Sequence, residues 1–337
     1  MMNLYISFFY FLLILGTLIS ISSNTWLVSW TGLEINLMSI MVLMSHNHSK
    51  NKAESTIKYF LIQAMASAMF LFTSIYFILL YQSDSFMMKT TSSIILCMTL
   101  FLKMGAAPFH FWLPEVMSGV DWKTNFIIMT WQKIAPMILI YYTLPNMIIF
   151  STIILTSSMI SGIQGINQTS FFKIMAYSSI NHTSWMISAI LSSLKIWTIY
   201  FIIYTFINLL MTTILNKFNI MNTSQMTNIF NNNKMIKFIF FMNLMNLGGL
   251  PPLLGFMPKW LVTMNLVNLK LYLLATMLII FTLITLYFYI RITLSTFSIN
   301  TNETLIKNFN KINHFYMILN IFSLVSLMLC TMSSAYL

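Results

Sequence analysis

The chain has 337 residues, of which 58% are hydrophobic and only 7% are charged, and its mean hydropathy is +0.81. Soluble domains carry about 25% charged residues, so this composition excludes a water-soluble globular protein and predicts an all-α, polytopic bundle of transmembrane helices. The net charge of +11 would suggest nucleic-acid binding in a soluble protein. Here the basic residues lie mainly in loops between apolar runs, so they indicate membrane topology and no nucleic-acid partner.

Eleven apolar runs predict about eleven transmembrane helices. They cover residues 4–22, 25–44, 57–80, 91–116, 125–143, 147–165, 171–191, 196–216, 236–270, 272–295 and 315–335. Two of them, 91–116 and 236–270, are too long for one simple span. Glycine and proline interrupt the first near residues 105–108 and the second near residues 248–258, which predicts two broken helices.

The spacing of the two breaks predicts an internal inverted repeat. Paired interrupted helices are the sequence feature that best indicates an ion site at the bilayer midplane. The second break lies five helices after the first, and this odd spacing would give the two halves opposite orientations. We expect a first five-helix unit over residues 1–145 and a second over 146–296. A loop and a C-terminal transmembrane helix would occupy residues 297–337.

The basic loop residues predict the orientation. Eleven lie on one side of the bundle and three, Lys89, Lys195 and Lys270, on the other. By the positive-inside rule, the N-terminus and the basic loops lie inside, and an odd number of helices puts the C-terminus on the opposite face.

Residue usage indicates an animal mitochondrial gene. For a protein of the mitochondrial inner membrane, the inside of the positive-inside rule is the matrix. Arg291 is the only arginine among 17 basic residues, while methionine is abundant at 30 residues. Very AT-rich coding, with ATA read as methionine, produces this pattern. The first apolar run begins by Leu4 with no arginine-rich presequence before it, so we expect no import from the cytosol.

Four charged residues fall inside apolar runs and cannot be placed in loops: Glu34, Lys103, Lys133 and Lys259. Each would cost about 2.5–3.5 kcal/mol near a bilayer centre, so together they oppose insertion by roughly 10 kcal/mol. Such groups persist where they face a bundle interior and find partners. We therefore predict that they form a path that binds and releases protons, although each could also snorkel or tie helices together.

The sequence around each lysine predicts its environment. Lys103 ends a half-helix whose free carbonyls would favour its charged form, and Glu34 is its expected partner. Pro136 removes a hydrogen bond to the Gln132 carbonyl and would open a polar notch beside Lys133. Lys259 follows the second break, where the positive end of a new half-helix would disfavour its charge.

Two histidines are candidate proton relays. His110 follows the first break, and His182 lies in a helix among hydroxyl side chains. Each has a structural alternative, namely a hydrogen bond to freed backbone for His110 and interhelical packing for His182. Cys97 and Cys330 lie in apolar runs without ligand spacing, so we expect no metal site. No phosphate loop, dinucleotide fingerprint or cysteine cluster is present, so this chain is predicted to hold no cofactor and to transfer no electrons itself.

Four stretches resemble the NADH dehydrogenase (ubiquinone) subunit 2 family, the antiporter-like membrane subunits of mitochondrial respiratory complex I, and an insect source is expected. They are WTGLEINL at residues 30–37, KMGAAPFHFW at 103–112, TWQKIAP at 130–136 and GGLPPLLGFMPKW at 248–260. They follow the family's order over most of the chain. One departure is Ser184, where the family usually has glycine two residues after the histidine that matches His182.

The resemblance implies a function and partners. Glu34, Lys103, Lys133 and Lys259 would line a hydrophilic axis that couples NADH oxidation and ubiquinone reduction on other subunits to proton translocation. FMN, iron–sulfur clusters and ubiquinone would bind those other subunits. The expected partners are membrane-arm and accessory subunits and the lipid of the mitochondrial inner membrane, cardiolipin included, with no homo-oligomer. A stand-alone cation/proton antiporter and a structural scaffold of the membrane arm remain alternatives.

Overall fold

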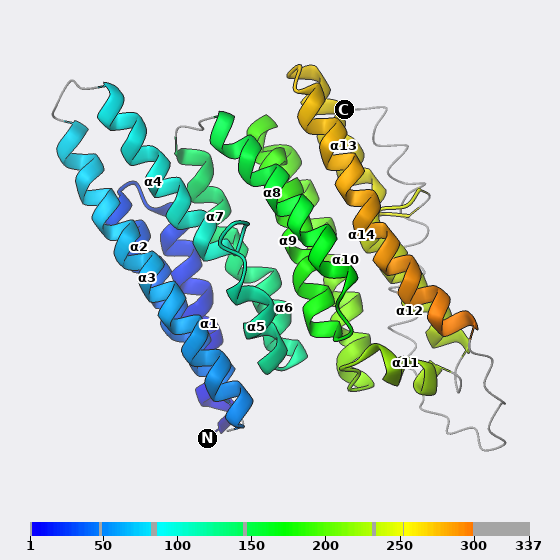
Figure 1. Cartoon of the computed structure of the whole chain (residues 1–337). Coiled ribbons are helices and arrows are strands. Elements are labelled where there is room, and N and C mark those ends of the chain that lie inside the picture. Colours follow the sequence, from blue (N-terminus) through cyan, green and yellow to red (C-terminus); the bar gives the residue numbers. More distant parts are fainter. Residues whose placement is uncertain are drawn as a thin grey trace. The chain divides into compact units, whose positions relative to one another are not determined.

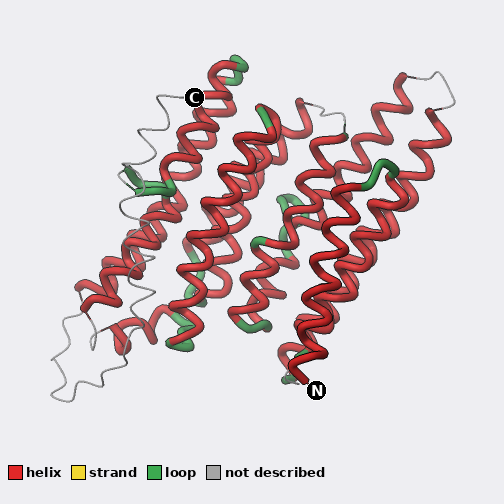
Figure 2. The backbone as a smooth tube through the Cα atoms, turned by 180° about the vertical axis from the view of Figure 1, so that it is seen from behind, coloured by secondary structure: helices red, strands yellow, loops and turns green. Residues whose placement is uncertain are grey.

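The structure is a computed structural model that describes residues 2–298 except 47–48, 82–85, 144–146, 231–233 and 252. Within this part of the chain every regular element is an α-helix (Figures 1 and 2), apart from one isolated bridge between Ser170 and Asn222. The all-α prediction is therefore confirmed. The predicted span 315–335 lies outside the described residues.

Six described helices are long and apolar enough to cross a membrane by length and composition. They are α1 (Met2–Ser22), α2 (Trp26–Ser45), α3 (Lys50–Tyr81), α8 (Met147–Ile166), α10 (Leu194–Lys217) and α14 (Tyr272–Ser298). The predicted span 171–191 is α9 (Phe171–Ser192), which has the length of a span but carries many polar side chains.

The remaining predicted spans consist of pairs of shorter helices. They are α4 (Phe86–Met104) with α5 (Trp112–Gly119), α6 (Trp122–Met129) with α7 (Trp131–Tyr142), and α12 (Lys234–Gly248) with α13 (Phe256–Asn268). Both predicted interruptions, near 105–108 and 248–258, are present as loops between helices (Figure 2). A short helix, α11 (Thr223–Phe230), lies between the predicted spans 196–216 and 236–270.

The chain divides into two compact units, Met1–Ile153 and Ile154–Leu337. In the first unit α3 packs against α2, α4 and α5, while α7 packs against α1, α4 and α6. In the second unit α9 packs against α10, α13 and α14, and α12 packs against α10 and α14. Each unit thus surrounds its own broken helix with neighbouring helices.

The prediction of one continuous helix over 125–143 is wrong. The helix is interrupted at Thr130, between α6 and α7, where φ is −113° and ψ is −71°. The Lys133 amide then bonds to the Thr130 carbonyl, a tighter i−3 bond. Pro136 lies inside α7 and directly affects the carbonyl four residues before it, at Gln132, whereas the interruption at Thr130 lies six residues before it.

Helices α1 and α2 meet backbone to backbone at two glycines. A Cβ atom on Gly32 would lie 2.6 Å from the Ser20 amide nitrogen, and one on Gly16 would lie 2.8 Å from the Gly32 carbonyl oxygen. Small residues allow this close approach, which is the main packing device between helices in lipid. The contact fixes the position of α2, the helix that carries Glu34.

Replacing Gly32 with leucine should therefore separate α1 from α2. The larger side chain cannot fit against backbone atoms, so we expect a loss of about 3 kcal/mol or more in stability. Limited proteolysis of membranes should show faster cleavage of the variant chain. Thr31→Leu is the matched control, since Thr31 is exposed. Equal protection of the Gly32 variant and the control would contradict the packing argument.

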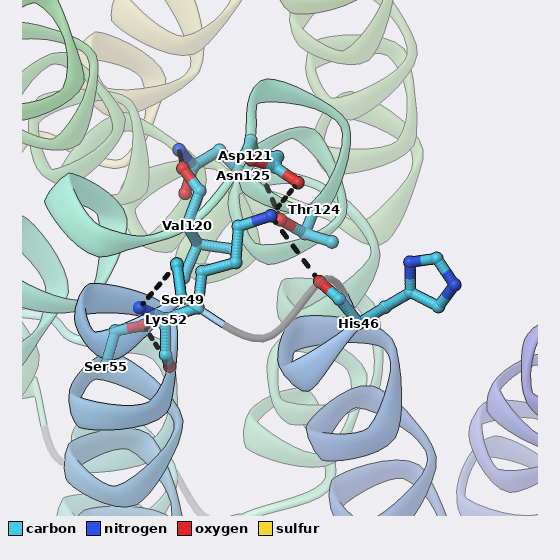
Figure 3. Close-up of polar contacts among 8 residues, drawn as sticks. All are labelled: His46, Ser49, Lys52, Ser55, Val120, Asp121, Thr124 and Asn125. Atoms are coloured by element: carbon cyan, nitrogen blue, oxygen red, sulfur yellow. Dashed lines mark hydrogen bonds and ion pairs between the residues drawn. The ribbon is translucent and has the colours of Figure 1, made fainter.

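A polar network ties the α5–α6 turn to the beginning of α3 (Figure 3). The Lys52 ammonium forms an ion pair with the Asp121 carboxylate, and the Asn125 amide donates to the carbonyls of Met117 and Val120 at 2.9 and 3.1 Å. Lys58 adds a second link, 3.0 Å from the Glu115 carboxylate. These contacts hold the segment that follows the first break.

Candidate functional site

Both broken helices end in the same backbone motif. Gly105 has φ +71° and Gly249 has φ +72°, the left-handed region that favours glycine. The next amide reaches back to a carbonyl five residues earlier, from Ala106 to Phe101 at 3.1 Å and from Leu250 to Met245 at 3.3 Å. Each half-helix therefore ends in a Schellman turn, which stops the helix inside its unit.

At the first break, two side chains take the helix-end carbonyls that sequence reasoning assigned to the Lys103 ammonium. Gln63 Nε2 donates to the Lys103 carbonyl at 3.2 Å, and Trp112 Nε1 donates to the Leu102 carbonyl, also at 3.2 Å. The expectation that these carbonyls stay free for Lys103 is therefore wrong. The cause is tertiary: α3 and α5 present amide and indole donors where the helix ends.

The Lys103 ammonium is buried with an aromatic ring beside it. The residue is in the last turn of α4, and its Nζ lies 5.7 Å from the centre of the Phe70 ring. A ring face at this distance attracts a cation. Lys103 thus retains a favourable contact in its charged form although its surroundings are apolar.

Glu34 acts on Lys103 electrostatically but does not touch it. It lies half-buried on α2, and it is the charged group whose field acts on Lys103. Among the described residues the ion pairs within 4.0 Å join Lys52 to Asp121 and Lys58 to Glu54 and Glu115, so Glu34 and Lys103 are not in direct contact here.

Lys133 is the most deeply buried of the three lysines. Its exposed fraction is 1%, against 6% for Lys103 and 7% for Lys259. It lies in the first turn of α7, directly after the interruption at Thr130. A lysine without an exposed route to water must exchange its proton through groups inside the protein.

The side chain next to Lys133 bridges three helices. Gln132 Nε2 donates to Asn36 Oδ1 on α2 at 2.8 Å, and the Tyr59 hydroxyl on α3 donates to Gln132 Oε1 at 3.4 Å. The Tyr59 ring in turn packs edge-on against Trp112, with 5.7 Å between ring centres. The hydrogen bonds connect the start of α7 to α2, the helix that carries Glu34, and to α3. The ring contact between Tyr59 and Trp112 extends the connection to the first break.

His110 lies in the loop of the first break and is buried. Its Nδ1 is 3.3 Å from the Pro108 carbonyl oxygen, and its ring lies against that of Phe111, with 4.3 Å between ring centres and 33° between ring planes. The contact with freed backbone is the one that the structural alternative expected. A relay role for His110 stays a prediction.

In the second unit, the Lys259 ammonium closes the end of the broken helix. It lies in the first turn of α13, yet its Nζ donates to the Gly248 carbonyl at the end of α12, at 2.7 Å. The flexible side chain thus folds back to the negative end of α12, a partner that the sequence did not predict, while the influence of the positive end of α13 on Lys259 stays a prediction. Its Nζ is also 5.9 Å from the Trp185 ring.

The loop that allows this contact is tightly constrained. The Gly255 amide donates to Asn246 Oδ1 at 2.7 Å, which joins the end of the loop to α12. A Cβ atom on Gly249 would lie 2.9 Å from Lys259 Cδ, so the lysine stem packs directly on this glycine. Glycine at both positions is what brings the ammonium to the carbonyl.

His182 lies on α9, in the interior of the second unit. Its Nδ1 is 2.8 Å from the Tyr200 hydroxyl, and its ring centre is 4.9 Å from that of Tyr204. On the same helix the Asn181 amide donates to the Thr285 hydroxyl of α14 at 3.2 Å. The polar residues of α9 therefore face other helices rather than lipid.

The site residues lie in separate units. Glu34, Lys103, His110 and Lys133 belong to the first unit, while His182 and Lys259 belong to the second. The residues that sequence reasoning missed are neutral: Gln63, Tyr59, Asn36 and Gln132 in the first unit and Tyr200 in the second. A single amide or phenol in an apolar run is the signal that could have found them. Within residues 2–298 as described, no group of three His, Cys, Asp or Glu side chains could hold a metal ion.

Comparison with known proteins decides the family. The family model described as NADH:quinone oxidoreductase/Mrp antiporter, transmembrane, matches residues 23–285. NADH-ubiquinone oxidoreductase chain 2 of Anopheles gambiae is 44% identical over 330 residues, which cover 96% of each chain. The chain belongs to the NADH-ubiquinone oxidoreductase chain 2 family. The resemblance noted in the sequence is confirmed.

Membership of this family establishes the general function. The chain is a multi-pass membrane subunit of NADH-ubiquinone oxidoreductase, or complex I, a proton-translocating oxidoreductase. A chain of respiratory complex I from Thermus thermophilus has the same fold, with a TM-score of 0.84 and 20% identity over 96% of this chain and 78% of that one. A chain of the Mrp complex from Dietzia sp. is also similar, with a TM-score of 0.77 and 10% identity over 94% and 73%.

Proposed function

We propose that Glu34, Lys103, Lys133 and Lys259 carry protons, or the charge changes that drive them, through this subunit of complex I. The single observation that supports this most is the deep burial of three lysines, each next to a break in a helix. Ionisable groups in such places are costly, and their function is the usual reason that they persist. His110 and His182 would relay protons between them.

The mechanism begins with a change of charge near Glu34. Glu34 acts on Lys103 across a gap rather than through a contact, so the energy of their interaction depends on the distance between them and changes when either group moves. A charge change arriving from the quinone end would shift this interaction, alter the proton affinity of Lys133, and pass a proton on toward Lys259. One pKa unit corresponds to about 1.4 kcal/mol, so modest rearrangements are sufficient.

We propose the mitochondrial inner membrane as the location, with the N-terminus in the matrix and the C-terminus in the intermembrane space. The distribution of basic loop residues and the residue usage support this. Residues 1–145 and 146–296 would form the two halves of an inverted repeat, each containing one broken helix. Their matching Schellman turns at Gly105 and Gly249 support the repeat.

The proposed partners are the other membrane-arm and accessory subunits of complex I and the lipid bilayer, cardiolipin included. The Thermus thermophilus neighbour comes from such a complex. FMN, iron–sulfur clusters and ubiquinone would bind other subunits, and this chain would form no homo-oligomer. NADH oxidation would then take place elsewhere, with this subunit serving proton movement.

A stand-alone cation/proton antiporter is the second candidate. The similarity to the Mrp complex and the family description favour it as an alternative. A structural scaffold is the third, in which the buried charges would only fix helix register.

A native gel distinguishes assembly in complex I from independent function. Mildly solubilised mitochondrial membranes should give a band with NADH dehydrogenase activity, and mass spectrometry of that band should find peptides of this chain. A chain that migrates alone, with sodium-dependent proton exchange in vesicles, would instead favour the antiporter. The proton path itself is tested separately, by replacing Lys133 with methionine.

A further inference from the structure

His182 on α9 is held by two tyrosines from the neighbouring helix α10. Tyr200 and Tyr204 are one turn apart on α10, so both side chains lie on the face that packs against α9. The Tyr200 hydroxyl lies 2.8 Å from His182 Nδ1, and the Tyr204 ring packs against the imidazole at an angle of 45°. All three side chains are at most 5% exposed.

This arrangement fixes both the orientation and the hydrogen bonding of the imidazole. The phenol can donate to Nδ1 when the ring is neutral, which places the ring proton on Nε2. It can also accept from Nδ1–H when the ring is protonated, because the hydroxyl carries lone pairs as well as a hydrogen. Tyr204 occupies the ring face and limits rotation of the imidazole.

We infer that Tyr200 is a positioning residue for proton transfer at His182. A proton that arrives along the proposed path binds Nδ1 of the neutral imidazole, and that N–H then donates to the Tyr200 oxygen, whose own O–H bond stays intact and rotates away from the ring. The imidazolium returns to its neutral form when it gives one ring proton to the next group on the path. The Tyr204 and Tyr289 hydroxyls are close enough to act on Tyr200 electrostatically, so the hydroxyl turns within a polar cluster.

The same cluster lies close to a lysine of the proposed path. Trp185 follows His182 by three residues on α9, one turn along the same helix, and the Lys259 ammonium lies 5.9 Å from its ring. Three helices packed against α9 contribute titratable side chains to this cluster and its surroundings. They are Tyr200 and Tyr204 from α10, Lys259 from α13 and Tyr289 from α14. The imidazole that Tyr200 orients therefore lies one helical turn from Trp185, the residue whose ring the Lys259 ammonium approaches.

The inference rests on the proposal that His182 lies on the proton path. It is tested in coupled membrane vesicles that contain complex I with Tyr200→Phe, His182→Gln or both changes. Tyr287→Phe is the matched control, because it makes the same change on an exposed part of α14. Turnover with NADH, the KM for a ubiquinone analogue and the protons moved per NADH are measured for each.

We expect Tyr200→Phe to lower proton-coupled turnover roughly two- to tenfold, the effect of losing one neutral hydrogen bond, with the KM for the ubiquinone analogue unchanged. The double variant should be no worse than His182→Gln alone, since both changes remove the same function. The control should be unaffected.

Each other outcome overturns the inference. Normal pumping by Tyr200→Phe while His182→Gln is impaired would show that His182 works without the phenol. Additive losses in the double variant would show that Tyr200 acts independently, as a packing residue would. If the His182→Gln variant pumps normally, His182 is not on the proton path and the inference fails. The proposed function is judged separately, by proton pumping in the Lys133→Met variant.

Discussion

Complex I with Lys133→Met in this subunit should assemble normally yet lose most or all redox-linked proton translocation, by at least about tenfold. The ammonium is 1% exposed at the start of α7, so the change removes a buried charge and leaves the packing nearly unaltered. Methionine has a similar length and an adaptable apolar chain, and it avoids the desolvation penalty of the lysine. Proton uptake and NADH oxidation are measured together in coupled vesicles.

Lys123→Met is the control, because Lys123 is exposed on α6 in the same unit. It should leave the ratio of protons to NADH unchanged. Normal pumping by the Lys133 variant would reject the proton path and favour the scaffold, in which neutral replacements at buried lysines are harmless. Failure of the variant to assemble would count against our expectation that this lysine is dispensable for folding.

Gly255→Ala should prevent stable folding of the second broken helix. A Cβ atom there would lie 1.8 Å from the Asn246 carbonyl oxygen and 2.9 Å from the carbonyl carbon, both of them backbone atoms of α12 that cannot turn aside as a flexible side chain could. The displaced loop would also lose the bond from the Gly255 amide to Asn246 Oδ1. We expect a loss above about 4 kcal/mol, in the range of severe single substitutions, and strongly reduced complex on native gels.

Gly248→Ala is a close control seven residues away. Its added Cβ atom would meet side-chain carbons of Tyr289 and Leu286 at 3.5 Å or more, which is ordinary contact. Because alanine favours helix and Gly248 ends α12, this variant should assemble like the unmodified chain. Equal abundance of the two variants would contradict the steric argument at Gly255.

The outline of the fold and the buried charges could be predicted because both depend on local sequence. Apolar runs locate the helices, and Gly105 and Gly249 mark the breaks because few other residues adopt a positive φ at low cost. Lysines within such runs are conspicuous because charge there is expensive. None of this requires knowledge of which helices are neighbours.

The partners of these groups could not be predicted, because they come from helices distant in sequence. Gln63 on α3 donates to one of the helix-end carbonyls that were expected to be free, and the Lys259 ammonium donates to a carbonyl eleven residues earlier in the chain. The interruption at Thr130 was missed because the proline points to another place. Pro136 directly affects the carbonyl at Gln132, four residues earlier, and not the peptide at Thr130.

The bond from Lys259 to the Gly248 carbonyl has a consequence for communication over distance. A carbonyl is a dipole, so it stabilises an ammonium without cancelling its unit of charge. Every proton gained or lost there changes the net charge of the surroundings by one. With an effective dielectric constant of about 20, that change is felt 20 Å away as about 0.8 kcal/mol. Proton occupancy at one lysine can thus be registered by another ionisable group through the electric field alone, with no moving part between them.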